Sequence, residues 1–212
     1  MPDFDRSPDG LAFSQAVQEM QRRFGSRKFY EMAEWPIDIS RDLEQFISRQ
    51  RSLFIATASA AGQPYIQHRG GAPGFLKVLN SRMLAMPDMR GNGQYITAGN
   101  LSENSAIVLF LIDYATRTRI KIWGKARRIE GNSDLISRVC ALGAPESAAV
   151  LSIHVEAWDA NCPQHIPLRM EMEEVEQQLA ERDRRIAELE RELADYRERF
   201  PVWDGCGDDL WD

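Results

Sequence analysis

The sequence has few cysteines and no long hydrophobic run. Its three cysteines, Cys140, Cys162 and Cys206, are an odd number and lie far apart, which does not fit a disulfide-stabilised fold. No stretch reaches the roughly 18 consecutive apolar residues that a membrane-spanning helix needs. The polar start, MPDFDRSPDG, lacks the apolar segment of a signal peptide. We therefore expect a cytoplasmic protein with no membrane-spanning segment.

The sequence also lacks a basic excess and the common catalytic motifs. Its formal net charge is -6, which argues against a nucleic-acid partner because phosphates favour a basic surface. There is no GxGxxG after a strand, no phosphate loop ending in GK[ST], no HExxH and no GxSxG. Serine hydrolases and nucleotide hydrolases therefore lose support. A local basic pocket for a small phosphorylated ligand stays open.

What is present begins with a helical segment, residues 1–50. Between Leu11 and Phe24 the apolar residues recur at helical spacing, and Gly25 is a plausible stop. A second helix is expected over residues 26–35. A third is expected from Ser40 to about Arg49, with acidic residues in its first turn. We assign these helices to an N-terminal extension.

From residue 51 the hydrophobic period changes to that of strands. The run TRTRIKIWGKARRIE places Ile120, Ile122 and Gly124 on one face and Lys121 and Trp123 on the other, as in a half-buried antiparallel strand. About six such runs with short links predict an antiparallel barrel or sandwich over residues 51–160. A short helix is expected within this region, at residues 133–142.

Residues 161–200 are expected to form a turn and one long helix, followed by a flexible tail at 201–212. The apolar positions of this helix step by three and four alternately, with Arg182 as a charged interruption, which is a heptad pattern. They are Met172, Val175, Leu179, Ile186, Leu189, Leu193, Tyr196 and Phe200. So polar a helix needs a packing partner, either its own domain or a second chain. The heptads favour pairing in a homodimer.

Two glycine-rich turns carry basic residues. His68, Arg69, Gly70 and Gly71 follow a strand, with Lys77 a little further on. A phosphate site needs positive charge, hydrogen-bond donors and close backbone approach. A hairpin turn that happens to contain cations is an equally good interpretation of this stretch alone.

The second turn leaves the strand near Met86 and enters an expected helix around Gln94. Arg90, Gly91, Asn92 and Gly93 lie at this junction, where free amide groups of a helix N-terminus can bind an anion. An ordinary Asn-Gly loop is the alternative. Because two such turns occur, one shared phosphate site is favoured over either turn alone.

A third cluster, in NCPQHIPLR, contains Cys162, Gln164 and His165. Cys-x-x-His is at most half of a metal site. No second such pair exists in the sequence, and we predict no metal. A turn with local hydrogen bonds before the long helix is the simpler interpretation.

These residues resemble the pyridoxamine 5′-phosphate oxidase-like family of flavin-binding split barrels. More narrowly, they are similar to the flavin-nucleotide-binding members with a helical N-terminal extension. The most specific part is HRGGAPGFLKV followed by PDMRGN. The residues that carry the resemblance are GSRKFYEMAE, FIATASAAGQPYIQHRGGAPGFLKVL, MPDMRGNGQYITAGNLSEN, IKIWGKARRI and NCPQHIPLR.

The resemblance implies a mainly β fold with flanking helices. This is a six-stranded antiparallel split β-barrel with N-terminal helices and a long, coiled-coil-like C-terminal helix. It also implies a homodimer with FMN sites at the interface. The implied cofactor-binding residues are His68, Arg69, Gly70, Gly71, Lys77, Met86, Pro87, Arg90, Asn92, Gln94, Arg119 and Trp123.

The resemblance divides these residues by role. Arg69, Lys77, Arg90 and Asn92 would hold the FMN phosphate. Gly70 and Gly71 would let the backbone approach the flavin. Met86 and Pro87 would line the isoalloxazine ring. Arg119 would lie near the ring, with Trp123 close by in sequence.

The chain lacks the C-terminal substrate motif of the true pyridoxamine phosphate oxidases, so vitamin B6 oxidation is not implied. The leading hypothesis is an FMN-dependent oxidoreductase acting on a small molecule, with NADH or NADPH as a candidate donor. Arg119 or Lys121 would stabilise charge near the flavin, and His165 would act as acid or base. The alternative is a non-catalytic flavin- or haem-binding dimer that serves as a sensor or carrier. Deazaflavin stays open as a ligand, as does an interaction protein without any cofactor.

Overall fold

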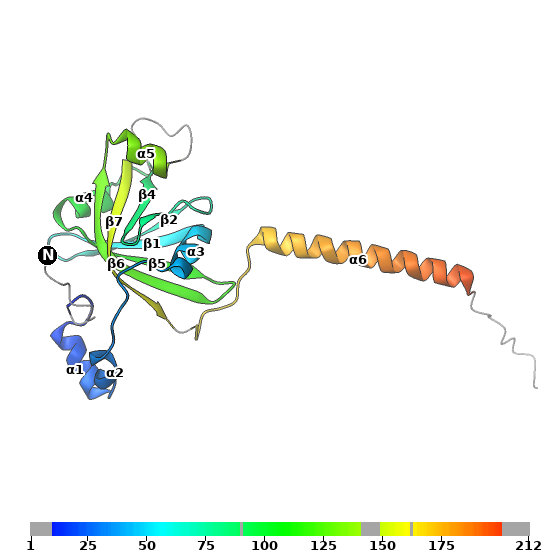
Figure 1. The fold of residues 1–212 in the computed structure, drawn as a ribbon, viewed down its shortest axis with the longest axis horizontal. Helices are drawn as coiled ribbons and strands as arrows, with labels where there is room; N and C mark the ends of the chain where they lie inside the picture. The colour runs from blue at the N-terminus through cyan, green and yellow to red at the C-terminus, as the bar shows by residue number, and fades with distance from the viewer. Residues whose placement is uncertain (1–9, 90, 141–148, 162, 201–212) are drawn as a thin grey trace, which may run out of the picture. The chain divides into compact units, whose positions relative to one another are not determined.

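The computed structural model describes residues 10–89, 91–140, 149–161 and 163–200. The chain divides into two compact units, Met1–Pro167 and Leu168–Asp212. Within the described ranges, the first unit contains all strands and five helices (Figure 1). Its helices are α1 (Gln15–Arg23), α2 (Arg27–Glu31), α3 (Arg41–Arg49), α4 (Ile96–Glu103) and α5 (Ser133–Val139). Its strands are β1 (Ser52–Ala58), β2 (Pro64–Gly70), β3 (Lys77–Asn80), β4 (Met83–Asp88), β5 (Ala106–Asp113), β6 (Thr118–Ile129) and β7 (Ala149–Asn161).

The strands form one antiparallel sheet, in the order β2-β1-β5-β6-β7-β4-β3. The mainly β fold with flanking helices is therefore confirmed. The sheet has seven strands, so the expected count of six was wrong. Within this sheet, Lys77–Asn80 and Met83–Asp88 pair as a hairpin with a register shift between Val78 and Asn80.

The sheet curls on itself (Figure 1), and its buried hydrophobic side chains form the core. Buried and half-buried residues alternate along β1. Along β6 the inward-facing residues are Ile120, Ile122, Gly124 and Ala126, as the alternation in the sequence predicts. Fully buried side chains from several strands fill the interior. Among them are Leu53, Ile55, Leu84, Met86, Leu109, Leu111, Ile122, Leu151 and Ile153.

Serine caps start two of the N-terminal helices. The Val17 amide donates to Ser14 Oγ at 3.4 Å, and the Leu43 amide donates to Ser40 Oγ at 3.2 Å. Such caps satisfy an amide that has no partner within the helix. The third helix begins where the sequence predicts, and it buries Leu43, Phe46 and Ile47 in the core. The expected helix over 26–35 is shorter, because only Arg27–Glu31 is helical.

Aromatic contacts attach the N-terminal segment to the barrel. The rings of Trp35 and Trp123 stack with centroids 4.4 Å apart. Phe13 packs edge-on against both Tyr30 and Trp35, at 5.3 and 5.5 Å. The indole Nε1 of Trp158 donates to the Asp38 carbonyl oxygen at 3.0 Å. Trp123 thus serves as the docking surface for the segment before α3.

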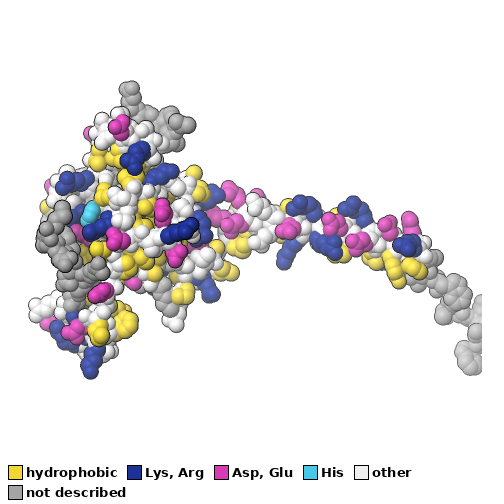
Figure 2. Space-filling model, viewed as in Figure 1, with side chains coloured by type: hydrophobic (Ala, Val, Ile, Leu, Met, Phe, Trp, Pro, Cys, Tyr) yellow, Lys and Arg dark blue, Asp and Glu magenta, His cyan; other side chains and the backbone are white. Residues whose placement is uncertain are grey.

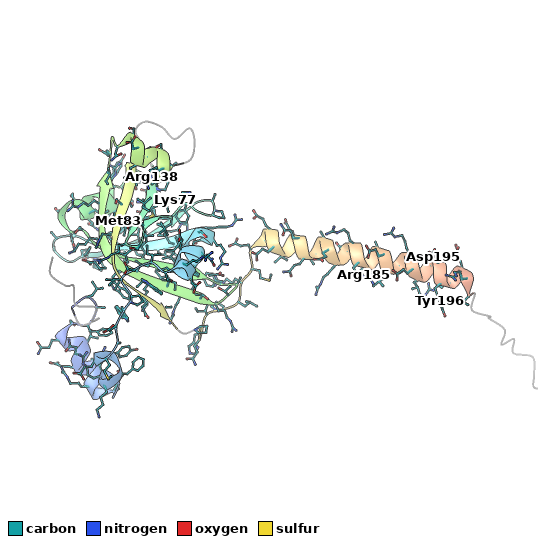
Figure 3. All side chains as sticks on the ribbon, viewed as in Figure 1. Lys77, Met83, Arg138, Arg185, Asp195 and Tyr196 are labelled. Carbon is teal, nitrogen blue, oxygen red and sulfur yellow. The ribbon has the colours of Figure 1, made fainter. Side chains whose placement is uncertain are left out.

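The second unit contains α6 (Met172–Arg199), which confirms the long C-terminal helix. It is one continuous helix whose side chains project around its axis (Figures 1 and 3). Lys or Arg and Asp or Glu side chains are interspersed along it, and hydrophobic side chains gather near its C-terminal end (Figure 2). None of the helices in the described ranges is long and apolar enough to cross a membrane.

Candidate functional site

A cleft of about 400 Å³ opens where β2, β4 and β6 approach the loop before α4. Its walls mix aromatic, amide and charged side chains with a glycine-rich backbone. Its lining residues are Tyr65, Gln67, Arg69, Asp88, Met89, Gly91, Asn92, Gly93, Gln94, Tyr95, Ile96, Thr97, Ala98 and Arg128. The volume falls within the range of roughly 300–1,000 Å³ that is usual for small-molecule sites.

Two arginines converge on one carboxylate in this cleft. Arg69 Nη2 lies 2.9 Å from Asp88 Oδ1, and Arg128 Nε lies 2.7 Å from Asp88 Oδ2. Arg128 also pairs with Glu130 through Nη1. The Asp88 side chain is 12% exposed and that of Arg69 is 15% exposed, so water screens this contact only partly. Two guanidinium groups are therefore held in place around an internal carboxylate at the cleft.

Arg128 keeps its charge in this setting. The carboxylates of Glu130 and Asp88 raise the pKa of the Arg128 guanidinium. Arg69 Nε is buried, and it has no hydrogen-bond partner within the described part of the chain. A buried donor without a partner is unfavourable.

Two hydrogen bonds fix α4 over the barrel. Thr97 Oγ1 donates to Gln67 Oε1 on β2 at 2.6 Å. Asn100 Nδ2 donates to Thr57 Oγ1 on β1 at 3.0 Å, in a buried position. The N-cap residue Tyr95 has a left-handed backbone, and no side chain caps its helix. The first amides of α4 are thus held in place at the cleft and are suited to an anionic ligand.

Three of the predicted site residues meet at this cleft: Arg69, Asn92 and Gln94. They come from both glycine-rich turns, which the sequence predicts to share one site. The backbone N–H of Gln94 donates to Asn92 Oδ1 at 3.2 Å, which helps to fix the conformation of the loop. Arg90 and Cys162 lie outside the described residues.

Other predicted residues of the first turn and β4 do not line the cleft. His68 is exposed on the opposite face of β2 from Arg69 and packs edge-on against Phe54, at 5.6 Å. The Met86 side chain is buried in the core. Pro87 is half-buried, and Lys77, labelled in Figure 3, is exposed at the start of β3. Neither belongs to the lining.

The two adjacent glycines are explained by packing within the chain. A Cβ at Gly71 would lie 2.7 Å from Phe75 Cβ. A Cβ at Gly70 would lie 3.1 Å from the Arg51 carbonyl oxygen. Both distances are shorter than ordinary contacts between side chains and neighbouring atoms. Glycine at these two positions therefore leaves room for the Arg51 carbonyl oxygen and for the Phe75 side chain.

The predicted catalytic residues are also outside the lining of the cleft. Arg119 is on β6, nine residues before Arg128, which corresponds to about 30 Å along a strand. Trp123 is engaged by Trp35, and Lys121 Nζ lies 5.5 Å from the Trp123 ring centroid. His165 is exposed in a turn, with a left-handed φ of 64°. A single chain does not bring these side chains to the cleft.

Sequence reasoning missed Asp88 and Arg128. Asp88 continues the inward series of Leu84 and Met86, and Arg128 continues that of Ala126. A charged residue at an inward position near a strand end is the signal that was available. Tyr65 and Gln67 share the face of Arg69 by the same period.

The described residues contain no group of three or more His, Cys, Asp or Glu side chains placed to hold a metal ion. Cys140 packs beside α5 against the outer face of the sheet. Burial raises the pKa of its thiol, which makes it a poor nucleophile at neutral pH. The donors that line the cleft itself are guanidinium, amide and hydroxyl groups.

Comparison with known proteins agrees with this architecture. Residues 39–162 match the family model described as pyridoxamine 5′-phosphate oxidase. This span includes the whole sheet and the cleft. No curated protein matches the chain significantly.

Several solved structures resemble the chain at low sequence identity. HupZ of Group A Streptococcus is 20% identical, with 62% of this chain and 99% of that chain covered and a TM-score of 0.47. A Clostridium acetobutylicum protein related to general stress protein 26 is 10% identical, with 63% and 94% covered and a TM-score of 0.46. HutZ, the haem storage protein of Vibrio cholerae, is 17% identical, with 57% and 94% covered and a TM-score of 0.43. On the match of its sequence to the family model, the chain belongs to the pyridoxamine 5′-phosphate oxidase family of split barrels.

Proposed function

We propose that the protein binds FMN in the cleft and acts as an FMN-dependent oxidoreductase on a small molecule. The observation that carries the proposal is the convergence of Arg69 and Arg128 on one point of the cleft, at 2.9 and 2.7 Å from the two Asp88 oxygens. Paired guanidinium groups bind phosphate well because each offers several donors in a planar fork. The family to which the chain belongs typically binds flavin.

The residues of the cleft fit this cofactor. Arg69 and Arg128 supply two guanidinium charges at the cleft. Asn92, Gln94 and the first amides of α4 add neutral donors. Tyr65 and Tyr95 give aromatic surface for a planar ring system. Arg69, Arg128 and Asn92 are therefore the residues that we assign to the phosphate.

Asp88 gives this site a distinctive electrostatic property. Its carboxylate lies between the two arginines and neutralises part of their charge. A phosphate must either displace this carboxylate or share the guanidinium groups with it. Asp88 therefore keeps the arginines ordered without ligand, while it lowers the affinity for an anion through like-charge repulsion.

When bound, FMN supplies the hydride-transfer chemistry that no side chain can perform. The protein's contribution is to bind the phosphate, orient the ring and limit water access. Arg119, Lys121, Trp123 and His165 lie away from the cleft of their own chain. We propose that the chain is a homodimer in which residues of this group act on the partner's site. NADH or NADPH is the proposed donor.

A non-catalytic flavin- or haem-binding dimer is the second candidate. It keeps the same cleft, and it predicts ligand binding without turnover. None of the chain's three histidines lines the described cleft, so haem has less support from this site than flavin. His165 or His68 could serve as a haem ligand only outside it.

The first experiment is an absorption spectrum of the purified protein, with the released ligand identified by mass. Flavin bands and an FMN mass support the proposal, whereas a Soret band replaces it with haem. Protein without a ligand is then titrated with FMN and with riboflavin, which lacks the phosphate. Arg69→Gln should weaken FMN binding by about tenfold to a hundredfold and leave riboflavin binding unchanged.

Arg41→Gln is the matched control, because Arg41 is exposed on α3 and should not affect either ligand. Equal losses for FMN and riboflavin in Arg69→Gln would remove the phosphate role. Oxidation of NADH or NADPH by the flavin-loaded protein separates the enzyme from the carrier. A protein that binds neither flavin nor haem would overturn both candidates.

A further inference from the structure

Asp88 is a carboxylate enclosed by the two arginines of the cleft. Its Oδ1 faces Arg69 Nη2 at 2.9 Å, and its Oδ2 accepts from Arg128 Nε at 2.7 Å. The Asp88 side chain is 12% exposed, whereas that of Glu130, the second carboxylate on Arg128, is 68% exposed. These two acids and two bases together carry no net charge. Within this group, no positive charge is left unmatched for a phosphate dianion.

The backbone keeps Asp88 between the arginines. Asp88 ends β4, and its partner across the ladder is Ala149 on β7. An aspartate side chain is short and moves only between a few rotamers, so its carboxylate stays close to both arginines while the strand is paired. A phosphate bound by the same guanidinium groups therefore lies within a few ångströms of Asp88.

Other charges beside the cleft do not alter this balance. Among the described residues that line it, the charged ones are the two arginines and Asp88. The lining residues Tyr65 and Tyr95 contribute neutral hydroxyl groups. On the strands that bear the arginines, His68 and Arg127 occupy the opposite faces, and the first turn of α4 has no acidic residue.

The elements packed against β4 place their charges elsewhere. Lys77 of β3 belongs to the outer face of the sheet, as does α5 with Asp134 and Arg138. His154 of β7 lies at the opposite end of β4 from Asp88. The carboxylate that a bound phosphate meets in the cleft is therefore that of Asp88.

We infer that Asp88 makes the cleft bind phosphate together with one proton, so that FMN binding takes up a proton from the solvent. Two negative groups a few ångströms apart in a partly buried site do not both stay ionised, and one proton is shared between them. A phosphate monoester suits this arrangement because its second ionisation occurs at about pH 6. The shared proton lies in a hydrogen bond between phosphate and carboxylate, and the other phosphate oxygens accept from the arginines. The inference rests on the proposed binding of FMN in this cleft.

Proton uptake gives FMN binding a definite pH dependence. Above about pH 7 free FMN is mainly a dianion, so the dissociation constant should rise about tenfold between about pH 7 and about pH 8. Riboflavin has no phosphate, and its affinity should stay constant over this range. Asp88→Asn has no carboxylate to share a proton, so its affinity for FMN should also stay nearly constant. The advantage of this variant over the native protein should therefore grow with pH.

Titration calorimetry counts the proton directly. The full chain, freed of ligand, is titrated with FMN at about pH 7.5 in two buffers of different ionisation enthalpy, and the difference in heat gives the number of protons taken up. We expect about one proton for FMN and none for riboflavin. Asp88→Asn should abolish the uptake. Glu130→Gln is the matched control, because it removes the exposed carboxylate on Arg128 and should leave the uptake unchanged.

Binding of FMN to the native protein without proton uptake would overturn the inference and leave the proposed function standing. This result is expected if the phosphate displaces Asp88 from the arginines, because both groups then stay ionised. It requires no variant, so the test does not depend on how a variant folds. Uptake that persists in Asp88→Asn would assign the proton to another group and would also overturn the inference. A protein that binds no flavin would overturn the proposed function and the inference with it.

Discussion

Arg69 and Asp88 form a 2.9 Å ion pair between β2 and β4, two strands that are not neighbours in the sheet. β2 is one edge of the sheet, and β4 is next to the other edge. The ion pair therefore joins the two ends of the curled sheet beside the cleft. The proposed anion site and the closure of the barrel therefore use the same side chains.

Replacing Asp88 by Asn should tighten FMN binding. The substitution removes a negative charge between two guanidinium groups while it keeps one hydrogen-bond acceptor. The Asp88 charge repels a phosphate several ångströms away. At the effective dielectric constant of a protein surface, loss of this repulsion should raise the affinity for FMN about tenfold. Fluorescence titration with FMN measures it.

Riboflavin is the control ligand for Asp88→Asn, and its affinity should not change. Thermal unfolding of the variant checks that the arginines are still held by a folded barrel. Weaker binding of FMN by a fully folded variant would show that Asp88 orients the arginines more than it repels the phosphate. That result would remove the proposed electrostatic role of Asp88.

Gly124→Ala should destabilise the sheet. Gly124 lies at a β-bulge, where the register of β6 and β7 shifts, and a Cβ there would lie 2.2 Å from the His154 carbonyl oxygen. Because backbone must move to make room, we expect a loss of roughly 2–4 kcal/mol in the free energy of unfolding. Urea denaturation gives this value.

Gly99→Ala is the matched control for that variant. Gly99 is in α4, and a Cβ there meets nothing within 4 Å. Alanine should stabilise this helix by up to about 1 kcal/mol. Similar stabilities for the two alanine variants would mean that the close contact at Gly124 is readily relieved.

His154 should titrate below the usual histidine range. Partial desolvation, then the charges of Arg82 and Lys125, lower the pKa of His154, while Glu156 opposes them. As pH falls below about 6.5, His154 is protonated in the unfolded chain before it is protonated in the folded protein. The free energy of unfolding therefore decreases between about pH 6.5 and the lower pKa of the folded state. NMR titration of the imidazole gives the folded pKa directly.

Charge variants test the causes of that shift with opposite signs. Arg82→Gln should raise the pKa of His154, and Glu156→Gln should lower it further. A His154 pKa at or above 6.5 in the unmodified protein would contradict the electrostatic picture of this face of the sheet.

Trp35→Ala should loosen the N-terminal helices without unfolding the barrel. The stacked pair with Trp123 contributes about 1 kcal/mol beyond the area that it buries. Hydrogen exchange should accelerate in α1 and α2 and stay slow in β5 and β6. Met32→Ala serves as the control, because Met32 is 85% exposed. Faster exchange throughout the barrel in Trp35→Ala would show that the stack supports the core instead.

The sequence alone predicts the elements that depend on local periodicity. The alternation around Ile120 and Ile122 predicts β6. Ser40 and the acidic residues Asp42 and Glu44 predict the start of α3. The steps of three and four after Met172 predict α6. These patterns are readable because backbone geometry repeats at a fixed period within each element. The sequence also predicts that the two glycine-rich turns meet, and Arg69, Asn92 and Gln94 line one cleft.

Only the tertiary structure decided which side chains meet at the cleft. Arg69, Asp88 and Arg128 are separated by 19 and 40 residues along the chain, and their contact follows from how the sheet curls until β2 reaches β4. No local pattern encodes that closure, because it depends on packing among all seven strands. For the same reason Met86 lies in the core and Gly71 accommodates Phe75. Local periodicity determines which face of a strand a residue occupies, and long-range packing determines what that face meets.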